Sequence, residues 1–494
     1  MPFNSINYFL FLPVVYLVFL LAGDRGRWLV LLAASLVFYA TLKVPYLLAV
    51  LALVAITTYL FGNWLDQAKA PNAKLALLWG GIAANVFILI TMKYLPFLSE
   101  NVRTLAAALS LNLQLHPVEP FVAIGVSYFV FQAMSYLIDI YLEIEKPERN
   151  FGYFALYLSF FPKLLQGPIE RAGALVPQLK EKYQFNYDNM RSGMLLFAWG
   201  LFKKVVIADR LGLYVDPVYG DVHAFSGLSL LLATYAYAFQ VYLDFSGYTD
   251  MALGVARLFN IDLTQNFNSP YLATSVADFW RRWHITFSRW ILDYIFKPLQ
   301  MRWRDWKNWG TAAALVATFL VSGVWHGASW GFVIWGGLHG LYMACSVFYK
   351  PYQKKWHKAL HLEKTWALKI FQIFVTFNLT SLAWIFFRAP NLKDALYVVE
   401  HLCAGVVRSN SLHSLKDALA PFFLKGGDRG IGIIVAAFLF MTAIDLFVCR
   451  ISSDHQALLL QSKYKRWFVY YSIGLWVAFF GLYTSSAGFI YLQF

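Results

Sequence analysis

The chain has 494 residues, of which 59% are apolar and only 14% are charged. A soluble globular domain usually carries about 25% charged residues, so the composition excludes an ordinary soluble enzyme and predicts a membrane protein. The net charge of +14 does not indicate a nucleic-acid partner, because the basic residues lie in the connections between apolar runs, where the positive-inside rule explains them.

Apolar runs long enough to approach the thickness of a bilayer follow one another along the whole chain. A helix needs roughly 20 residues to cross a hydrocarbon core of about 30 Å. The runs lie near 8–21, 28–42, 46–62, 76–92, 119–138, 152–166, 192–208, 227–258, 309–323, 329–349, 366–387, 430–448 and 467–491. Several are short, so we expect an all-α polytopic membrane protein with about 11–13 transmembrane or re-entrant helices.

Charge distribution predicts how these helices are oriented. Two connections are densely basic, 281–307 and 350–369, and we place both on the cytoplasmic side. The first run, Met1 to Leu21, has no preceding Lys or Arg and is followed by Arg25 and Arg27, which favours a retained helix with its N-terminus outside.

No Gly/Ser linker, repeat or soluble-sized polar segment divides the chain. We therefore expect one integral-membrane domain over 1–494, with N-terminal helices in 1–118, a core that carries the chemistry in 119–349 and C-terminal helices in 350–494. The chemistry must then take place within or at the edge of the membrane.

The connection 258–308 mixes Trp, Phe and Tyr with Arg, Lys, Asp and His, which is typical of an amphipathic helix in the membrane interface. In a continuous helix, Arg281, His284 and Ser288 would share one face. The aromatic residues Trp283, Phe287 and Trp290 would share a neighbouring face. We expect Pro270 to open this segment and Pro298 to close it.

Three of the ten histidines are candidates for catalysis: His284 in that segment, and His326 and His339 in the apolar run FLVSGVWHGASWGFVIWGGLHG. An ionisable side chain inside a membrane marks a functional site by default, although a histidine satisfied by one hydrogen bond is an equally reasonable interpretation. Small residues around His326 leave room for a ligand. The spacing of His and Cys does not suggest a zinc site, so we expect no metal.

Polar residues also concentrate in the run VYLDFSGYTDMALG, which contains Asp244, Ser246, Tyr248 and Asp250. Such a density within a span predicts side chains that face a cavity or the bundle interior. Packing of small residues between helices is the competing interpretation. No G-x-S-x-G elbow, Walker motif or dinucleotide fingerprint occurs in the chain.

Several blocks of sequence together resemble the membrane-bound O-acyltransferase (MBOAT) family. The run VSGVWHGASWGFVIWGGLHG resembles the family's signature segment, in which an invariant histidine aligns with His326. Four further blocks resemble the bacterial branch that includes the alginate O-acetylation protein: GVSYFVFQAMSYLIDIY (125–141), LSFFPKLLQGPIERA (158–172), 242–271 and DFWRRWHITFSRWILDYIFKPL (278–299). Lys163 departs from the glutamine that is frequent in that branch.

The resemblance implies an MBOAT fold, with helices around a central tunnel and interfacial amphipathic helices, and it implies site residues. It makes His326 the catalytic residue and His284 its partner. The resemblance also implies that a wider set of residues binds the substrate or the donor. These are Asp244, Ser246, Tyr248, Asn268, Arg281, Arg282, Ser288, Trp325 and His339. No bound cofactor is implied, and acetyl-CoA is the implied acyl donor.

The implied function is movement of acetyl groups from cytoplasmic acetyl-CoA across a bacterial inner membrane, for O-acetylation of an exported, alginate-like polysaccharide. The implied partners are that polysaccharide or periplasmic acetyl-accepting or acetyltransferase proteins, together with the lipid bilayer; no nucleic acid is implied. The basic connections 281–307 and 350–369 would attract the phosphates of the donor.

Two alternatives remain open at this point. The same fold is known to serve D-alanyl transfer and acetylation of peptidoglycan or cellulose, and the neighbouring genes would discriminate among these. A proton-coupled transporter or flippase would also place ionisable residues in the membrane, here His284, His326, Asp244 and Asp250, although it has no reason to reproduce the blocks described above.

Overall fold

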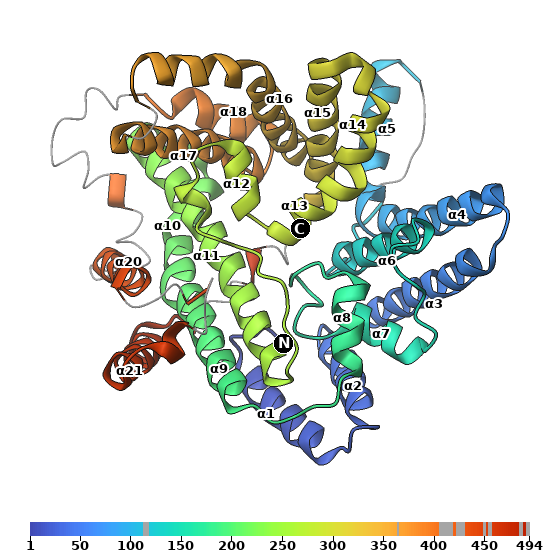
Figure 1. The fold of residues 1–494 in the computed structure, drawn as a ribbon. Helices are drawn as coiled ribbons and strands as arrows, with labels where there is room; N and C mark the ends of the chain where they lie inside the picture. The colour runs from blue at the N-terminus through green and yellow to red at the C-terminus, as the bar shows by residue number, and fades with distance from the viewer. Residues whose placement is uncertain are drawn as a thin grey trace. The chain divides into compact units, whose positions relative to one another are not determined.

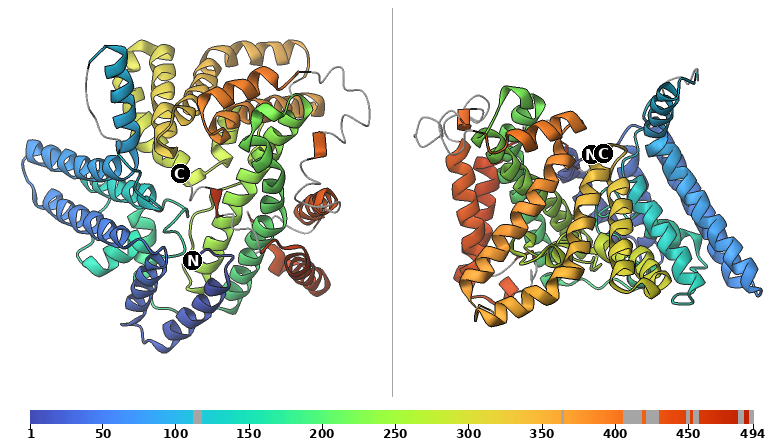
Figure 2. Two further views of the ribbon diagram at one scale, coloured as in Figure 1. Left: turned by 180° about the vertical axis from the view of Figure 1, so that it is seen from behind. Right: turned by 90° about the horizontal axis from the view of Figure 1, so that it is seen from above.

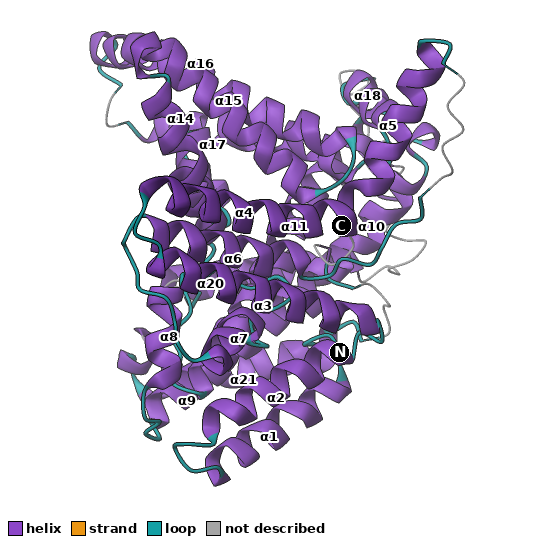
Figure 3. Ribbon diagram, turned by 90° about the vertical axis from the view of Figure 1, so that its right-hand side faces the viewer, coloured by secondary structure: helices purple, strands orange, loops and turns teal. Residues whose placement is uncertain are grey.

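The protein is helical throughout the parts that its computed structural model describes (Figure 3). The described residues are 1–111, 118–362, 365–404, 418–420, 430–447, 451–452, 457–483 and 488–490. Within these ranges the elements are helices and the loops between them. This confirms the prediction of an all-α fold.

Seven helices in the described part are long and apolar enough to cross a membrane. They are Pro45–Gln67, Pro71–Ala108, Leu228–Leu258, Arg304–His326, Trp330–Ala359, Trp366–Arg388 and Gly430–Phe447. The apolar helices α1 (Ile6–Leu21) and α2 (Arg27–Ala40) are shorter. The chain is therefore a multi-pass membrane protein, as its hydropathy predicts.

Large apolar side chains lie exposed along these helices. Phe87, Phe371, Phe374 and Leu439 are each more than half exposed. In water, contiguous exposed apolar surface on this scale would favour aggregation. Lipid chains remove that penalty, and the exposed rows of Phe and Leu therefore support the assignment of these helices to the membrane.

The chain divides into two compact units, and the first contains Met1–Phe197, Tyr248–Thr264 and Gly488–Phe494. Its helices, besides α1 and α2, are α3 (Pro45–Gln67), α4 (Pro71–Leu89), η1 (Ile90–Tyr94), α5 (Leu95–Ala108), α6 (Val126–Tyr141), α7 (Phe151–Ser159) and α8 (Ala172–Lys180). Helices α3, α4 and α6 pack against one another (Figures 1 and 2).

The second unit contains Ala198–Gly247 and Gln265–Ala487. Two helices, α9 (Tyr187–Phe202) and α11 (Leu228–Leu258), contribute residues to both units. The others are η2 (Lys203–Ala208), α10 (Asp209–Gly220), η3 (Val222–Ala224), η4 (Pro270–Leu272), α12 (Val276–Arg282), α13 (Ile285–Ile291), η5 (Leu292–Phe296), α14 (Lys297–Arg302), η6 (Arg304–Trp306), α15 (Lys307–His326), α16 (Trp330–Ala359), α17 (Trp366–Arg388), α18 (Leu392–His401), α20 (Gly430–Phe447), η8 (Ala457–Leu460) and α21 (Lys463–Phe480).

Two of the predicted apolar runs differ from simple spanning helices. The run 152–166 is helical only over α7, whose 9 residues reach about 14 Å, and the buried residues that follow form turns. Apolar composition alone cannot separate a buried turn from a helix. The run 467–491 is helical up to Phe480, and 484–487 and 491 lie outside the described residues.

The segment 258–308 also differs from its prediction as one amphipathic helix. It contains η4, α12, α13, η5, α14, η6 and the first residues of α15, with a break between α12 and α13 at His284. The expected face of Arg281, His284 and Ser288 is therefore wrong, because the helical register does not continue through the break. Pro298 lies in the first turn of α14, so it begins that helix instead of ending one.

Helices α15 and α16 form a hairpin and pack against each other (Figure 1), and glycines lie at their contact. A Cβ added at Gly336 would collide with the carbonyl oxygen of Phe319, and one at Gly340 would lie 2.9 Å from the Cα of Val316. Small residues spaced four apart allow backbones to approach in this way. This hairpin positions His326.

We expect Gly336→Ala to lower the midpoint of thermal unfolding in detergent, since neither helix backbone can move without losing the packing of the other. Gly337→Ala is the matched control, because its added Cβ meets only Leu320 Cδ2 at 3.7 Å. Equal unfolding midpoints for the two variants would show that the hairpin tolerates a wider separation.

Candidate active site

His326 is the last residue of α15, directly before the connection to α16. The helix ends there, and the side chain is 4% exposed. The ring is enclosed by aromatic side chains. Its ring centroid lies 4.8 Å from those of Trp325 and Trp335, 5.3 Å from that of Phe387 and 5.6 Å from that of Phe287.

His284 occupies the break between α12 and α13. Its φ of 41° lies in the left-handed region, which is uncommon for a residue other than glycine. The side chain is fully buried. Backbone strain of this kind costs about 1–3 kcal/mol and persists where surrounding contacts impose it, often at functional sites.

Asn266 supplies the contacts that hold this break. The backbone N–H of Ile285 donates to the carbonyl oxygen of Asn266 at 2.9 Å. Thr286 donates to Asn266 Oδ1 twice, from its backbone N–H at 3.1 Å and from its hydroxyl at 2.8 Å. His284 Nδ1 lies 3.1 Å from the same oxygen. Asn266, the first asparagine of the sequence N-F-N, thus places its side-chain amide against the strained residue His284.

These contacts assign the tautomer of His284. Because Asn266 Oδ1 already accepts from Thr286, it can only accept from Nδ1, so the proton lies on Nδ1 and the lone pair on Nε2. His284 lies outside the seven candidate spans, and burial lowers its pKa to about 3. The ring is therefore neutral at physiological pH and offers Nε2 as an acceptor.

The two histidines contact the same aromatic side chains. Phe287 lies 5.1 Å from the His284 ring and 5.6 Å from the His326 ring, as centroid separations. Trp325 lies 6.1 Å and 4.8 Å from them and stacks on Phe287 at 4.4 Å. The structure thus brings His326, His284 and Trp325 together, and their roles in catalysis and binding stay predictions.

His339 lies further along α16 and is fully buried. Trp280 Nε1–H donates to its Nδ1 at 3.2 Å, so the proton of the neutral ring is on Nε2. Its ring lies 5.0 Å from Trp335, which in turn contacts His326. His339 therefore belongs to the same aromatic cluster but reaches His326 through Trp335.

Asp244 has a different environment from the histidines. Lys204 Nζ lies 2.6 Å from Asp244 and 2.9 Å from Asp209, and all three side chains are buried. Removing one member of a buried ion pair leaves an uncompensated charge. This supports the bundle-interior interpretation of Asp244, and its role in substrate binding stays a prediction.

The other polar residues of that helix also lie buried. Ser246 belongs to the second unit, whereas Tyr248 and Asp250 belong to the first. The Tyr248 ring stacks on Phe3 at 4.7 Å and meets Phe489 edge-on at 5.1 Å. Their predicted roles in binding stay predictions.

Asn268 is exposed, and its backbone N–H donates to the carbonyl oxygen of Arg282 at 2.9 Å. The residue that contacts His284 is Asn266, which the sequence-based site omits. The available signal was the paired asparagine motif QNFNSP, but nothing in the spacing shows which amide faces inward.

The cations predicted to bind the donor lie beside a cavity of about 610 Å³ between α12, α13 and the α15–α16 hairpin. Arg281, Arg289 and Lys350 line it, together with Ser288 and apolar side chains. Arg281 also lies 3.8 Å from Asp278. Arg282 is half-buried, and its guanidinium pairs with Asp278 at 3.1 Å. Its charge is therefore compensated within the protein, and its role in donor binding stays a prediction.

Lys163, the departure from the branch pattern, is buried in the first unit. Its Nζ donates to Gln132 Oε1 at 2.8 Å and lies 5.1 Å from the ring centre of Tyr157. Burial lowers its pKa to about 7. A glutamine at this position would make the contact with Gln132 without a charge, and we assign Lys163 no function.

Metal ligands do not gather anywhere in the described ranges: no group of three His, Cys, Asp or Glu there could hold an ion. Cys345 and Cys403 are exposed and unbridged, and Cys449 lies outside the described residues.

Fold and site together define a multi-pass membrane protein with two buried imidazoles in an aromatic enclosure. A model of the membrane-bound O-acyltransferase family matches residues 143–387. A peptidoglycan O-acetyltransferase of Helicobacter pylori is 34% identical over 98% of this chain and 96% of its own. A probable alginate O-acetylase of Pseudomonas putida is 33% identical over 79% of this chain and 78% of its own.

A teichoic acid D-alanyltransferase of Bacillus subtilis is more distant, at 27% identity over 72% of this chain and 90% of its own. The chain belongs to the membrane-bound O-acyltransferase family, and it is an O-acyltransferase. The resemblance to the alginate-type bacterial branch is confirmed.

Proposed function

We propose that the chain is an O-acetyltransferase of a bacterial inner membrane, which takes acetyl groups from cytoplasmic acetyl-CoA and passes them outward for O-acetylation of an exported glycan. The observation that carries this proposal is the pair of buried imidazoles, His326 and His284, which contact the same two aromatic rings, Phe287 and Trp325.

In this proposal His326 is the general base. It accepts the proton of the attacking hydroxyl while that oxygen forms a bond to the thioester carbonyl carbon. The tetrahedral intermediate then collapses, the C–S bond breaks, and the departing thiolate takes the proton back from the imidazolium. Products are the acetyl ester and free CoA, so atoms and charge balance without a metal or a redox partner.

His284 contributes through the lone pair on Nε2. A neutral ring with its proton held on Nδ1 by Asn266 accepts a hydrogen bond from the substrate hydroxyl or from an amide of the donor. It does not donate to an oxyanion from Nε2. The buried Nδ2 of Asn266, which makes no hydrogen bond in the protein, is in this proposal the donor for developing negative charge.

The donor would enter through the cavity of about 610 Å³ lined by Arg281, Arg289 and Lys350. Arg and Lys make charge-assisted contacts with phosphates, and the apolar lining suits the uncharged arm that carries the thioester. The lining of this cavity includes Trp280. The Trp280 Nε1–H donates to His339 Nδ1, and the aromatic cluster continues from His339 through Trp335 to His326.

Two acceptors are supported by particular relatives. Alginate-like polysaccharide is the acceptor suggested by the branch resemblance and by the probable alginate O-acetylase. Peptidoglycan is favoured by the Helicobacter relative, because that alignment extends over 98% of this chain and so includes the C-terminal helices. In either case a periplasmic protein is the proposed recipient or carrier of the acetyl group.

Purified protein in liposomes, supplied with acetyl-labelled acetyl-CoA on the outside, tests the donor. We expect release of free CoA thiol on the side of supply and appearance of label on an acceptor hydroxyl. Alginate and peptidoglycan oligosaccharides, each trapped inside, distinguish the acceptors. If a D-alanyl thioester donor were cleaved and acetyl-CoA were not, the protein would be a D-alanyltransferase instead of an acetyltransferase.

Intact acetyl-CoA or another solute accumulating inside the liposomes, with no thiol released, would favour the transporter instead. A matched control is available in His223→Ala, because His223 is exposed and lies outside both basic connections. That variant should release thiol at the rate of the unaltered protein.

A further inference from the structure

Helices α10 and α11 contact each other through polar side chains along one face of each helix. At one end Lys204 Nζ lies 2.9 Å from Asp209 of α10 and 2.6 Å from Asp244 of α11. About three turns further along α10, the hydroxyl oxygens of Tyr219 and Thr234 lie 3.1 Å apart. Both contacts fit a single antiparallel register, because ten residues forward on α10 correspond to ten residues back on α11. The residues between them on these two faces therefore oppose each other.

Between these contacts lie polar side chains that the protein does not satisfy. A Cβ added at Gly212 would lie 2.9 Å from Gln240 Nε2 and 3.6 Å from Asp216 Oδ2. Tyr237 lies one turn from Gln240 on the same face of α11. Gln240 is 9% exposed and Tyr237 is 1% exposed, yet in the described part of the chain neither Gln240 Oε1 nor the Tyr237 hydroxyl has a hydrogen-bond partner. We refer to Asp216, Tyr237 and Gln240 as the polar row.

The unsatisfied atoms of the polar row indicate what kind of ligand it binds. A buried polar atom without a partner destabilises the fold, so such atoms are nearly always satisfied by protein, water or a ligand. Gln240 Oε1 only accepts hydrogen bonds, and the Tyr237 hydroxyl both donates and accepts. A group that donates and accepts hydrogen bonds without carrying charge fits both atoms. A hydroxyl group has these properties.

The polar row is accessible to water at the end of α17. Arg388 Nη2 donates to Asp216 Oδ1 at 2.9 Å, and the two side chains are 23% and 57% exposed. The guanidinium carbon lies 5.4 Å from the ring centre of Tyr219 and 5.9 Å from that of Tyr237. A guanidinium has five N–H donors and a carboxylate has two acceptor oxygens. One hydrogen bond between them therefore does not exhaust either group, and both can bind hydroxyls.

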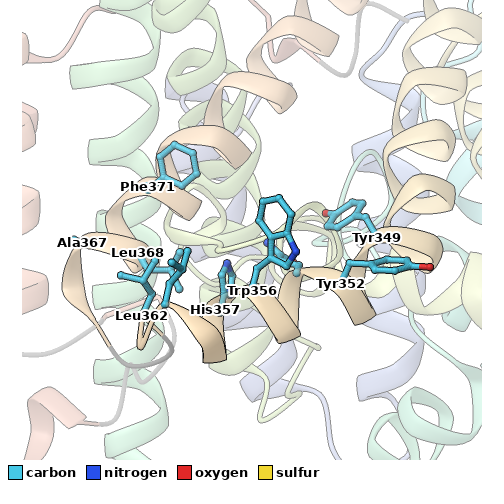
Figure 4. Close-up of a pocket in the computed structure, with 10 residues that line it drawn as sticks. Tyr349, Tyr352, Trp356, His357, Leu362, Ala367, Leu368 and Phe371 are labelled. Atoms are coloured by element: carbon cyan, nitrogen blue, oxygen red, sulfur yellow. The ribbon is translucent and has the colours of Figure 1, made fainter.

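Arg388 lies at the outward end of α17. This helix follows the basic connection 350–369, which its charge places on the cytoplasmic side. Exposed aromatic side chains that line a cavity at this end, such as Tyr349 and Trp356 (Figure 4), are typical of the membrane interface. Because α17 is a candidate span over Trp366–Arg388, its last residue lies at the opposite, outward face.

The same end of α17 contacts the aromatic enclosure of His326. The ring centroids of Phe387 and His326 are 5.3 Å apart, and Arg388 is the next residue. Successive residues of a helix differ by about 1.5 Å along its axis and by about 100° around it. His326 and the outward end of the polar row therefore lie at nearly the same level of α17, beside neighbouring faces of that helix.

We propose that the polar row and Arg388 bind a sugar residue of the acceptor glycan and so hold the glycan beside His326. Hydroxyls of the sugar bond Arg388 and Asp216 at the outward end. Further hydroxyls bond Tyr237 and Gln240 inside. A sugar presents hydroxyls on successive ring carbons and can reach partners on two turns of α11, whereas a Ser or Tyr side chain of a carrier protein presents only one. This inference rests on the proposed function.

Tyr237→Phe tests the site because it removes a single oxygen that has no hydrogen-bond partner among the described residues. We expect KM for the acceptor to rise by about 3-fold to 10-fold, the effect of one lost hydrogen bond, with KM for acetyl-CoA unchanged. Alginate and peptidoglycan oligosaccharides, each supplied with labelled acetyl-CoA to the purified full-length protein, are the probes. Gln240→Met, which keeps the length of the side chain, should raise the same KM.

Tyr219→Phe is the matched control, because the Tyr219 ring also lies near the Arg388 guanidinium but its hydroxyl contacts Thr234. This variant should lower the midpoint of thermal unfolding and leave both KM values unchanged, whereas Tyr237→Phe should not lower the midpoint. Equal acceptor KM values in the two variants, or a change confined to KM for acetyl-CoA, would overturn the site. An effect seen with a protein acceptor and with neither oligosaccharide would also overturn it.

Equilibrium binding of fluorescent oligosaccharides without acetyl-CoA separates this inference from the proposed function. Kd should be about 3-fold to 10-fold higher for Tyr237→Phe than for the unaltered protein. Equal Kd values, or no binding of either oligosaccharide, would overturn the sugar site even if acetyl transfer continued. Binding that depends on Tyr237 in a protein that transfers no acetyl group would overturn the proposed function and leave the sugar site in place.

Discussion

Replacement of His326 by alanine is expected to lower kcat for acyl transfer by a factor of about 10²–10⁴, the usual contribution of a positioned general base. The His326 ring is 4% exposed, and the residue ends a helix inside an aromatic enclosure. Release of CoA thiol from acetyl-CoA by the purified variant measures the effect, and KM for the donor should change little.

The fold of the variant must be checked separately, because removing a buried ring leaves a cavity. His326→Gln retains most of the volume and a hydrogen-bonding group but cannot act as a base near neutral pH. If His326→Gln were as active as the unaltered protein, proton transfer by this side chain would be excluded. His223→Ala again serves as the exposed control.

Membrane helices were largely predictable from the sequence because lipid imposes a simple rule: backbone groups must be satisfied within the segment. The long runs such as 227–258 and 366–387 correspond to α11 and α17. The rule fails where protein replaces lipid. The turns after α7 are apolar and buried, yet their backbone is satisfied by tertiary contacts, such as the Ser35 hydroxyl oxygen that accepts from Phe161 N–H at 3.0 Å.

The candidate site was predictable in part. The sequence singled out His326 because small residues surround it, and two of the glycines of that run, Gly323 and Gly336, lie at the contact between α15 and α16. The break at His284 was not predictable, because it depends on Asn266, a residue that is distant along the chain. Helical periodicity assumes local contacts, and here a single amide oxygen with three donors determines the backbone.

Asp244 and His284 are both buried, but they differ in how burial of the polar group is compensated. Asp244 is neutralised by Lys204 within hydrogen-bonding distance, which is a structural solution to burial. His284 is neutral through the lowering of its pKa by burial and through one partner on Nδ1. At His284 the Nε2 lone pair points away from Asn266, which orients the ring through Nδ1. A lone pair in this position can accept a hydrogen bond from a substrate.

Asn266→Asp tests that arrangement through pH. Asparagine and aspartate have nearly the same shape, so the contacts of Thr286 and His284 with Oδ1 should persist. A carboxylate beside the ring favours its charged form and moves the pKa of His284 upward, from about 3 toward or above its ordinary value of about 6.5. Below that pKa the proton occupies Nε2, and the acceptor is lost.

We therefore expect kcat/KM of Asn266→Asp to fall by at least about tenfold between pH 7.5 and pH 5.5, relative to the unaltered protein at the same pH values. In the unaltered protein His284 stays neutral over this range, so it contributes no acidic limb. Asn266→Ala, which removes the partner of Nδ1 without adding charge, should lose about 10-fold to 100-fold at every pH. Parallel pH profiles for Asn266→Asp and the unaltered protein would show that the lone pair of His284 takes no part in transfer, and the ring would then be a packing residue of the aromatic enclosure.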